Sequence, residues 1–355
     1  MKSGLQQSTR KDCAKAWFLF ISVIVFAFSA SALRDFESEF ASNIVVESTK
    51  IPIPGYPGAF NPSIIRYQGD LLLSFRFIPE RKDNMTSYIG LMFLNEDLTP
   101  MGDPQIIPLR RMSRIKSRAE DARLILVKER LYAVYSDNVD PKITKGGFRV
   151  FVVEIAFDEN EIILGKPEKL SDFEGKNPEI REKNWVPFDS DGVLRLAYSI
   201  DPHLIFTPRL DGSGICDTVA NSTTPYQWSF GTLRGGTPAF LMGNEYLAFF
   251  HTSMRVASVH SDGEDRMHYF MGAYTFQKDL PHKLTSISKE PIVGAGFYSG
   301  EQFQGYWKKV RAVFPGGYVF DDDHVLVAYG KDDADVWVAK LNRQALMNSL
   351  VRLDK

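Results

Sequence analysis

Short runs of alternating apolar and polar residues dominate the chain after residue 50. Long segments with apolar residues at helical spacing are nearly absent there, whereas alternating runs bounded by Gly, Asp, Asn and Pro recur. Successive side chains of a strand point to opposite faces, so this alternation is typical of half-buried strands. The pattern therefore predicts an all-β fold.

One pattern of strands occurs five times along the chain. The runs "LLLSFRF", "RLYAVYSD", "LRLAYSID", "YLAFFHT" and "VLVAYGKD" share an aromatic residue near their end, at Phe75, Tyr135, Tyr198, Phe250 and Tyr329. Each run follows a turn and another strand, such as "FNPSIIRY" or "GGTPAFLM". Five copies of this unit predict a five-bladed β-propeller. The alternative is a β-sandwich whose strands are similar by accident.

The N-terminus has a different pattern. A basic stretch that includes Lys11 and Lys15 precedes "AWFLFISVIVFAFSASAL", residues 16–33, which has no charge and ends in Ala-Ser-Ala before Leu33. These features are typical of a secretory signal peptide, and the length also fits a signal-anchor helix. A buried core helix is a third possibility, disfavoured because no polar face interrupts the run. We expect a secreted, periplasmic or lumenal protein, with membrane contact only through residues 16–33.

These patterns predict four parts in the chain. They are a signal peptide or signal-anchor over residues 1–33, a linker over 34–50, a propeller catalytic domain over 51–345 and a C-terminal tail over 346–355. Only Cys13 and Cys216 are present, so an exported domain would contain one cysteine and no internal disulfide. The apolar content of 44% is sufficient for a large core, which must stabilise the domain instead.

Composition and motifs exclude several functions. The net charge is -2 with no basic stripe, so the usual electrostatic basis for nucleic-acid binding is missing. Six histidines are scattered without metal-ligand spacing, which predicts no metal site. A G-x-S-x-G elbow, a P-loop and a dinucleotide fingerprint are also absent from the sequence, and we expect no cofactor.

The residues that open each repeated unit are the best candidates for a site. In a propeller the innermost strands begin around a central channel, so these openings converge. They are polar, in contrast to the strands behind them: Asn61; Glu120, Asp121 and Arg123; Lys183, Asn184 and Trp185; Arg234, Gly235 and Gly236; and Lys309 with Arg311. We predict a pocket there, although Asp121 and Arg123 taken singly could balance neighbouring charge, and His251 could be a core histidine.

The side chains available are carboxylates, cations and aromatic rings. A carboxylic acid can protonate a glycosidic oxygen, and polar side chains bind sugar hydroxyls. Lys183, His251 and the arginines could instead bind an anion such as phosphate. The openings therefore favour carbohydrate chemistry with an anionic component.

With these residues in view, the chain from Asn61 to Ala339 resembles the β-mannoside phosphorylases of glycoside hydrolase family 130 and the related β-1,2-mannosyltransferases, which are five-bladed propellers. "FNPSIIRYQGDLLLSFR" resembles the first blade of the family, "EDARL" its E-D-P-R catalytic motif and "KNWVPF" its K-N-x-x-P strand. "GGTPAFLMGNEYLAFFH" resembles the strand that leads to a histidine. Ala122 stands where the motif has proline.

The resemblance implies roles for individual residues. Asp121 would be the catalytic acid, which in this family is thought to protonate the glycosidic oxygen through a sugar hydroxyl while phosphate attacks the opposite face with inversion. Lys183 and His251 would bind phosphate, together with an arginine for which Arg81, Arg123 and Arg149 are candidates. We expect the mannosyl substrate to contact Asn61, Arg76, Glu120, Arg123, Trp185, Tyr329 and Asp333.

The sequence thus predicts an enzyme that cleaves β-mannosides by inverting phosphorolysis, or forms them from mannose 1-phosphate and an acceptor. Its partners would be a mannosyl oligosaccharide or glycan and phosphate, either free or in a phosphorylated donor. A β-mannosyltransferase or a β-mannoside hydrolase on the same scaffold remains open. A different class, an inactive propeller that binds glycans or proteins, is the remaining alternative.

Overall fold

The computed structural model describes residues 32–79, 86–109, 117–139, 147–159, 161–224, 226–301 and 309–353. By its contacts the chain divides into two units, residues 1–32 and Leu33–Lys355, and the second unit is the subject below. Most of the predicted signal segment, residues 16–31, lies outside the described residues. Within the described ranges, helices long and apolar enough to cross a membrane are absent.

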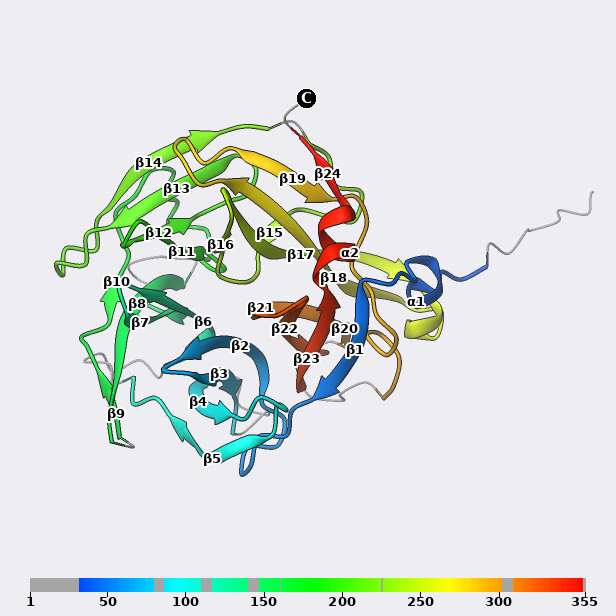
Figure 1. Ribbon diagram of the computed structural model, residues 1–355, viewed down its shortest axis with the longest axis horizontal. Coiled ribbons are helices and arrows are strands. Elements are labelled where there is room, and N and C mark those ends of the chain that lie inside the picture. The colour runs from blue at the N-terminus through cyan, green and yellow to red at the C-terminus, as the bar shows by residue number, and fades with distance from the viewer. Residues whose placement is uncertain are drawn as a thin grey trace, which may run out of the picture. The chain divides into compact units, whose positions relative to one another are not determined.

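The described strands form five sheets, which confirms the all-β prediction (Figure 1). The first contains β2 (Phe60–Tyr67), β3 (Asp70–Phe77), β4 (Tyr88–Leu94) and β5 (Pro100–Ile106). The second contains β6 (Glu120–Val127), β7 (Arg130–Asn138), β8 (Phe148–Asp158), β9 (Glu161–Leu164) and β10 (Glu168–Lys169). The third contains β11 (Val186–Ser190), β12 (Val193–Ala197), β13 (His203–Pro208) and β14 (Cys216–Ser222).

The last two sheets also contain the first and the last described strand, β1 and β24. The fourth contains β15 (Arg234–Gly235), β16 (Phe240–Met242), β17 (Glu245–Ala257), β18 (Asp265–Gln277), β19 (Leu284–Ser288), β20 (Val310–Arg311) and β24 (Leu350–Arg352). The fifth contains β21 (Val313–Asp321), β22 (His324–Lys331), β23 (Asp335–Asn342) and β1 (Val45–Lys50). The helical segments are short: α1 (Phe36–Glu39), η1 (Val259–Ser261) and α2 (Arg343–Asn348).

The sheets follow one another around a common centre, so the fold is propeller-like (Figure 1). Strand β2 packs beside both β21 and β6, and β6 packs beside β11. Hydrogen bonds join the first two sheets, since Ser74 Oγ donates to the Ala122 carbonyl at 3.2 Å and Leu124 N donates to Ser63 Oγ at 3.2 Å. The first strands of neighbouring sheets therefore meet in the middle of the molecule.

The structure corrects the predicted linker and tail. Residues 34–50 contain α1 and β1 rather than a linker, and β1 pairs with β23 from Val45–Leu341 to Lys50–Trp337. In the predicted tail, β24 pairs with β19. Both strands lie at the edge of a sheet and are largely exposed, so they lack the apolar alternation by which strands are recognised in a sequence.

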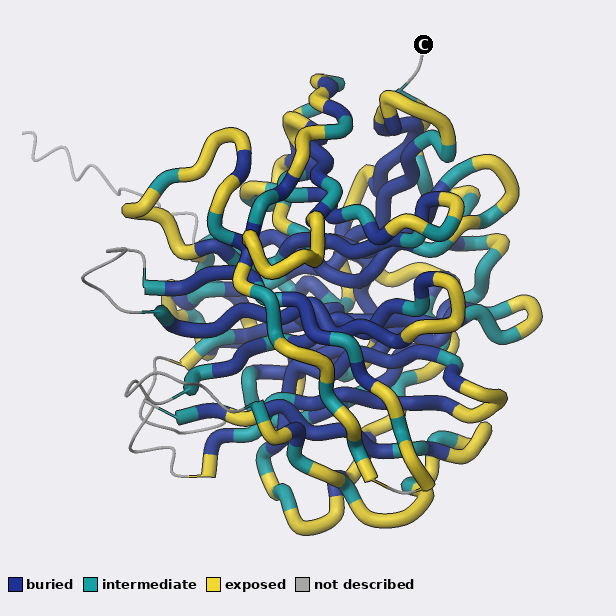
Figure 2. Tube along the Cα trace, turned by 90° about the vertical axis from the view of Figure 1, so that its left-hand side faces the viewer, coloured by how far each residue is buried: buried dark blue, intermediate teal, exposed yellow. Residues whose placement is uncertain are grey.

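Four of the five repeated aromatic residues belong to the core, whereas Tyr198 is partly buried and lines a pocket. Phe75, Tyr135, Phe250 and Tyr329 are all at most 3% exposed. Phe75 and Phe250 each lie opposite a glycine of the next strand, and a Cβ on that glycine would lie 2.2 or 2.3 Å from the ring. Figure 2 shows that the strands are buried in the middle of the molecule while the loops carry most of the exposed residues. The repeat thus reflects packing between sheets.

A β-bulge interrupts the start of β2 and of β6. The register shifts between Phe60 and Ser63 in β2 and between Glu120 and Arg123 in β6. The bulged residues Asn61 and Asp121 have φ of +48° and +54°, a left-handed conformation that Asn and Asp tolerate better than most residues. Each bulge redirects its polar side chain at the inner end of the strand.

Candidate active site

The two bulges bring polar side chains from the first two sheets into contact. Asn61 Nδ2 donates to Asp121 Oδ1 at 3.0 Å. From β3, Arg76 places one guanidinium nitrogen 2.9 Å from Glu120 Oε1 and another 3.5 Å from Asp121 Oδ1. A regular strand would point Glu120 and Asp121 to opposite faces, so the bulge allows both carboxylates to face Arg76.

Lys183 and Asp333 complete this cluster from two further sheets. Lys183 precedes β11 and places Nζ 2.5 Å from Glu120 Oε2. Asp333 lies in the turn between β22 and β23 with φ of +53°. Burial and the nearby charge of Asp121 raise the pKa of Asp333, whereas Arg76 and a hydrogen bond with Asn61 lower it less strongly. The structure therefore gathers six predicted residues: Asn61, Arg76, Glu120, Asp121, Lys183 and Asp333.

The two carboxylates of β6 have different surroundings. Burial acts to raise the pKa of Glu120, but the charges of Arg76 and Lys183 outweigh it, and the pKa is lowered. The Glu120 side chain is only 5% exposed and is neutralised by these two cations. The Asp121 side chain is 12% exposed and shares Arg76 with Glu120. Asp121 is therefore the carboxylate of β6 that is more accessible to a ligand.

Arg123 contacts the backbone and an amide group next to the cluster. It is 2% exposed, and burial lowers its pKa to about 10. Its guanidinium donates to the carbonyl of Asp121 at 2.9 Å, to Asn184 Oδ1 at 3.1 Å and to the Gly236 carbonyl. Arg123 thus connects the openings of three sheets through backbone and amide oxygens, which makes it a positioning residue rather than the sugar contact predicted from the sequence.

His251 lies near the cations. It is 2% exposed, with its ring centroid 4.6 Å from that of Phe314 and 6.1 Å from that of Tyr269. Burial, followed by the charges of Arg123 and Arg234, lowers the pKa of His251 to about 3. The imidazole is therefore neutral near pH 7, and any contact with phosphate is a hydrogen bond rather than an ion pair.

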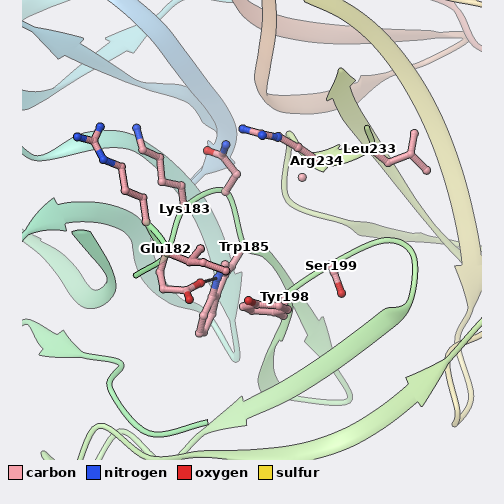
Figure 3. A pocket seen from close by; sticks show the side chains of 11 residues that line it. Glu182, Lys183, Trp185, Tyr198, Ser199, Leu233 and Arg234 are labelled. Carbon is pink, nitrogen blue, oxygen red and sulfur yellow. Dashed lines mark hydrogen bonds between the residues drawn. The ribbon is translucent and has the colours of Figure 1, made fainter. Parts of the chain in front are cut away.

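A pocket of about 460 Å³ opens beside Lys183 (Figure 3). It is lined by residues 180–185, 198–199 and 233–235. Figure 3 shows the ends of Lys183 and Arg234 on the same side of this pocket, whereas Glu182 extends toward Trp185, whose Nε1 lies 3.4 Å from Glu182 Oε2. The pocket therefore has a cationic side next to the polar cluster.

Tyr269 is a functional candidate that the sequence analysis does not include. Arg234 is one of the strand openings, and the structure places it in the lining of the pocket. Tyr269 of β18 is half-buried, and burial together with the charge of Asp333 raises its pKa. Tyr269 lies within the 13-residue strand β18, which is longer than most others. The length of this strand is the only signal that could have pointed to Tyr269.

Two aromatic residues that the sequence predicts as sugar contacts, Tyr329 and Trp185, are buried. Tyr329 has 0% exposure and packs between Phe297 and Trp337. Trp185 belongs to the wall of the pocket, but it is 1% exposed and packs on Phe173. Neither aromatic face is available to a sugar.

Of the candidate phosphate arginines, Arg123 is described above and Arg149 is held by backbone carbonyls. Arg149 is buried and donates to the backbone carbonyls of Phe148 at 2.8 Å and Ile180 at 3.1 Å. Arg81 lies outside the described residues. Across the described ranges, His, Cys, Asp and Glu side chains form no group that could hold a metal ion.

Fold, site and sequence profile together define a class of protein. The profile of glycoside hydrolase family 130, described as beta-1,4-mannooligosaccharide phosphorylase, matches residues 36–352. The chain therefore belongs to this family, as its motifs predicted. A search of curated proteins found no match.

Solved structures support the same fold. A beta-1,2-mannobiose phosphorylase from Listeria innocua has a TM-score of 0.56 and 17% identity, covering 86% of this chain and 96% of its own. MPT-4, a mannose phosphorylase from Leishmania mexicana in complex with phosphate, has a TM-score of 0.55 and 13% identity, covering 90% and 94%. A structure of the GH130 family, which contains hydrolases that target beta-1,2 mannosidic linkages in Candida mannan, has a TM-score of 0.59 and 15% identity, covering 93% and 98%.

Proposed function

We propose that this protein is an inverting β-mannoside phosphorylase with Asp121 as its general acid, and that its five sheets are the five blades of a propeller. Membership in family 130 supports activity on β-mannosides. The names of the Listeria and Leishmania proteins support phosphate as the second substrate. The reverse reaction would use mannose 1-phosphate and an acceptor sugar.

In the proposed reaction the mannosyl ring lies against Asn61, Arg76 and Asp333. Asp121 delivers a proton to the glycosidic oxygen, and this oxygen leaves with the electron pair of its bond to C1. An oxygen of phosphate attacks C1 from the opposite face, so the anomeric configuration inverts. The products are mannose 1-phosphate and the shortened mannoside.

The pairing of Glu120, the neighbour of Asp121, with two cations carries this proposal. Hydrolysis with inversion requires a second carboxylate that activates water. Glu120 cannot readily take that part, because its two oxygens lie 2.9 and 2.5 Å from Arg76 and Lys183. The space next to Lys183, Arg234 and neutral His251 suits an anion, which is itself a nucleophile and needs no base.

Transfer from a phosphorylated mannosyl donor is the second candidate function. The same cations would bind the phosphate of the donor, and Asp121 would act as the base for the acceptor hydroxyl. The predicted export of the chain favours this candidate, because a sugar phosphate is most useful in the cytoplasm. A reporter fused after Arg34 should appear outside the cytoplasm, and retention of the fusion inside would remove this support.

The decisive experiment incubates the purified protein with β-1,2- and β-1,4-mannobiose, with and without phosphate. Phosphorolysis predicts mannose 1-phosphate only when phosphate is present. Release of free mannose at the same rate without phosphate would establish a hydrolase instead. If both disaccharides stay intact, mannosyl transfer from mannose 1-phosphate or a nucleotide-linked mannose to mannobiose tests the second candidate.

A further inference from the structure

Three cations lie against one aromatic ring, and two of them, Arg181 and Lys183, line the pocket. The guanidinium carbons of Arg118 and Arg181 are 5.3 and 5.1 Å from the centroid of the Phe148 ring, and Lys183 Nζ is 5.1 Å from it. Arg118 precedes β6, Arg181 and Lys183 precede β11, and Phe148 opens β8. Two separate segments therefore bring positive charge to an aromatic ring that a third segment provides.

Stabilisation of the ring does not account for this arrangement. One cation over an aromatic face is a common favourable contact. Each further cation adds repulsion, because all three lie at about the same distance from one centroid. Covering an apolar ring requires only the methylene stem of one such side chain.

The charges are only partly compensated. Lys183 is paired with Glu120. Among the described residues, the side chains of Arg118 and Arg181 form no ion pair, and Arg118 Nε is buried without a hydrogen bond. An uncompensated buried donor is costly unless a ligand satisfies it. Among the described residues, the cluster thus has more positive charge than Glu120, which interacts with both Lys183 and Arg118, can compensate.

We propose that Arg118 and Arg181 form a second oxyanion subsite, next to the position assigned to the attacking or transferred phosphate. The inference rests on the proposed function, because the second oxyanion would belong to the same substrate. Lys183 connects the two positions: its ammonium group contacts Glu120 in the catalytic cluster and also lies over Phe148. Guanidinium groups suit this task, since their planar donors match two oxygens of one oxyanion.

This chemistry could come from two sources. A diphosphate-linked mannosyl donor carries a second phosphate next to the first. A phosphorylated mannoside carries its phosphate on the acceptor sugar. Pyrophosphate represents the first source, and mannose 6-phosphate represents the second. Inorganic phosphate is the reference with one phosphate group, and mannose is the neutral reference.

Calorimetric titration of the full chain with these four probes tests the proposal without requiring turnover. The double variant Arg118→Gln/Arg181→Gln should weaken binding of pyrophosphate or of mannose 6-phosphate at least about tenfold, and binding of inorganic phosphate by less than about threefold. The probe that loses affinity identifies the source of the oxyanion. Because binding is read directly, a failure of phosphorolysis would not affect this result.

Arg130→Gln is the matched control. Arg130 belongs to the same sheet and lies 5.6 Å over the Tyr132 ring, but it is already paired with Glu154. It should leave the affinity for every probe unchanged. Arg181→Gln alone, at an exposed position, should retain the fold and still weaken the sensitive probe severalfold. Wild-type protein that binds neither pyrophosphate nor mannose 6-phosphate, or equal losses in Arg130→Gln, would overturn the proposal.

Discussion

Two clusters of buried charge in this molecule have similar composition but different surroundings. The first, at the candidate site, joins Arg76 and Lys183 with Glu120 and Asp121. The second joins Arg311 and Lys331 with Asp332 and the backbone of residues 296–300. Asp332 and Asp333 are neighbours in the sequence, yet Asp332 belongs to the second cluster and Asp333 to the first.

In the second cluster the backbone satisfies most of the charged groups. Asp332 Oδ2 lies 3.1 Å from Arg311 Nη1, and Oδ1 accepts from Ala312 N at 2.7 Å. Lys331 Nζ donates to the carbonyls of Gly296 at 2.5 Å and Ser299 at 2.7 Å. Such contacts hold a loop in place and leave little for a ligand.

The comparison shows that burial of charge alone does not identify a site. In the first cluster the charged side chains contact one another, Asp121 remains partly exposed, and Lys183 lines a pocket. In the second cluster burial dominates and raises the pKa of Asp332 to about 6. The difference is whether side chains or backbone groups compensate the charge.

The largest expected effect comes from Asp121→Asn. Loss of a general acid typically costs about 10²–10⁴-fold in rate, while the partly exposed Asp121 side chain, with one amide and one arginine contact, can be replaced by its amide with little loss of stability. Turnover of mannobiose and thermal unfolding should be measured on the same preparation. Asp332→Asn is the control. The fraction of this variant that folds should retain its turnover of mannobiose. Full activity of Asp121→Asn together with a much lower melting temperature would reverse the roles of the two clusters.

Asp332→Ala should have the largest effect on stability. Removing one partner of a buried ion pair leaves the other charge uncompensated and costs about 3–5 kcal/mol. Ala312 N and Arg311 would both lose an acceptor. Denaturant unfolding measures the change, and Asp323→Ala, whose carboxylate is exposed and pairs only loosely with Arg343, is the control. Equal effects of the two substitutions would contradict a structural role for Asp332.

The two clusters should also differ in their dependence on pH. The folded-state pKa of Asp332 is about 6, above its ordinary value of 3.8, so the folded state binds this proton more tightly. The associated stability is present below pH 4 and is lost as the pH rises through 6, by at most roughly 3 kcal/mol. Glu120, whose pKa is lowered, contributes stability above its ordinary pKa of 4.5 that is lost as the pH falls.

Unfolding by urea between about pH 2 and pH 7 separates these contributions. Asp332→Asn should remove the decline in stability between pH 4 and pH 6. Glu120→Gln should keep that decline and instead flatten the loss at lower pH. An unchanged profile in Asp332→Asn would assign the titration to another group.

Lys183→Ala should have the smallest of these effects. The apparent Michaelis constant for phosphate should rise about tenfold or more, since a charge-assisted contact contributes about 1.5–3 kcal/mol, with a smaller change for the mannoside. Lys331→Ala is the matched control from the second cluster and should lower stability without changing the constant for phosphate. Phosphate-independent release of mannose, unaffected by Lys183→Ala, would show that the hydrolase alternative is correct.

Much of the site could be predicted from the chain. Asn61, Asp121 and Lys183 open repeated strands, and strand openings converge in a propeller, so their proximity followed from the repeat. The assignments of Trp185 and Tyr329 to the substrate could not be checked in the same way. An aromatic residue of a strand suits a core and a sugar-binding surface equally well, and only the packing of the neighbouring sheets shows that both rings are buried.

The sequence by itself determined the all-β class, the family and the set of polar strand openings, because alternation and repeated motifs are local properties of the chain. Tertiary structure alone decided which charges act together. The bulge at Asp121 turns two neighbouring carboxylates toward Arg76, and long-range packing places Asp333 in the site and Asp332 outside it. Charge compensation depends on distances between segments far apart in sequence, and no pattern within one segment specifies those distances.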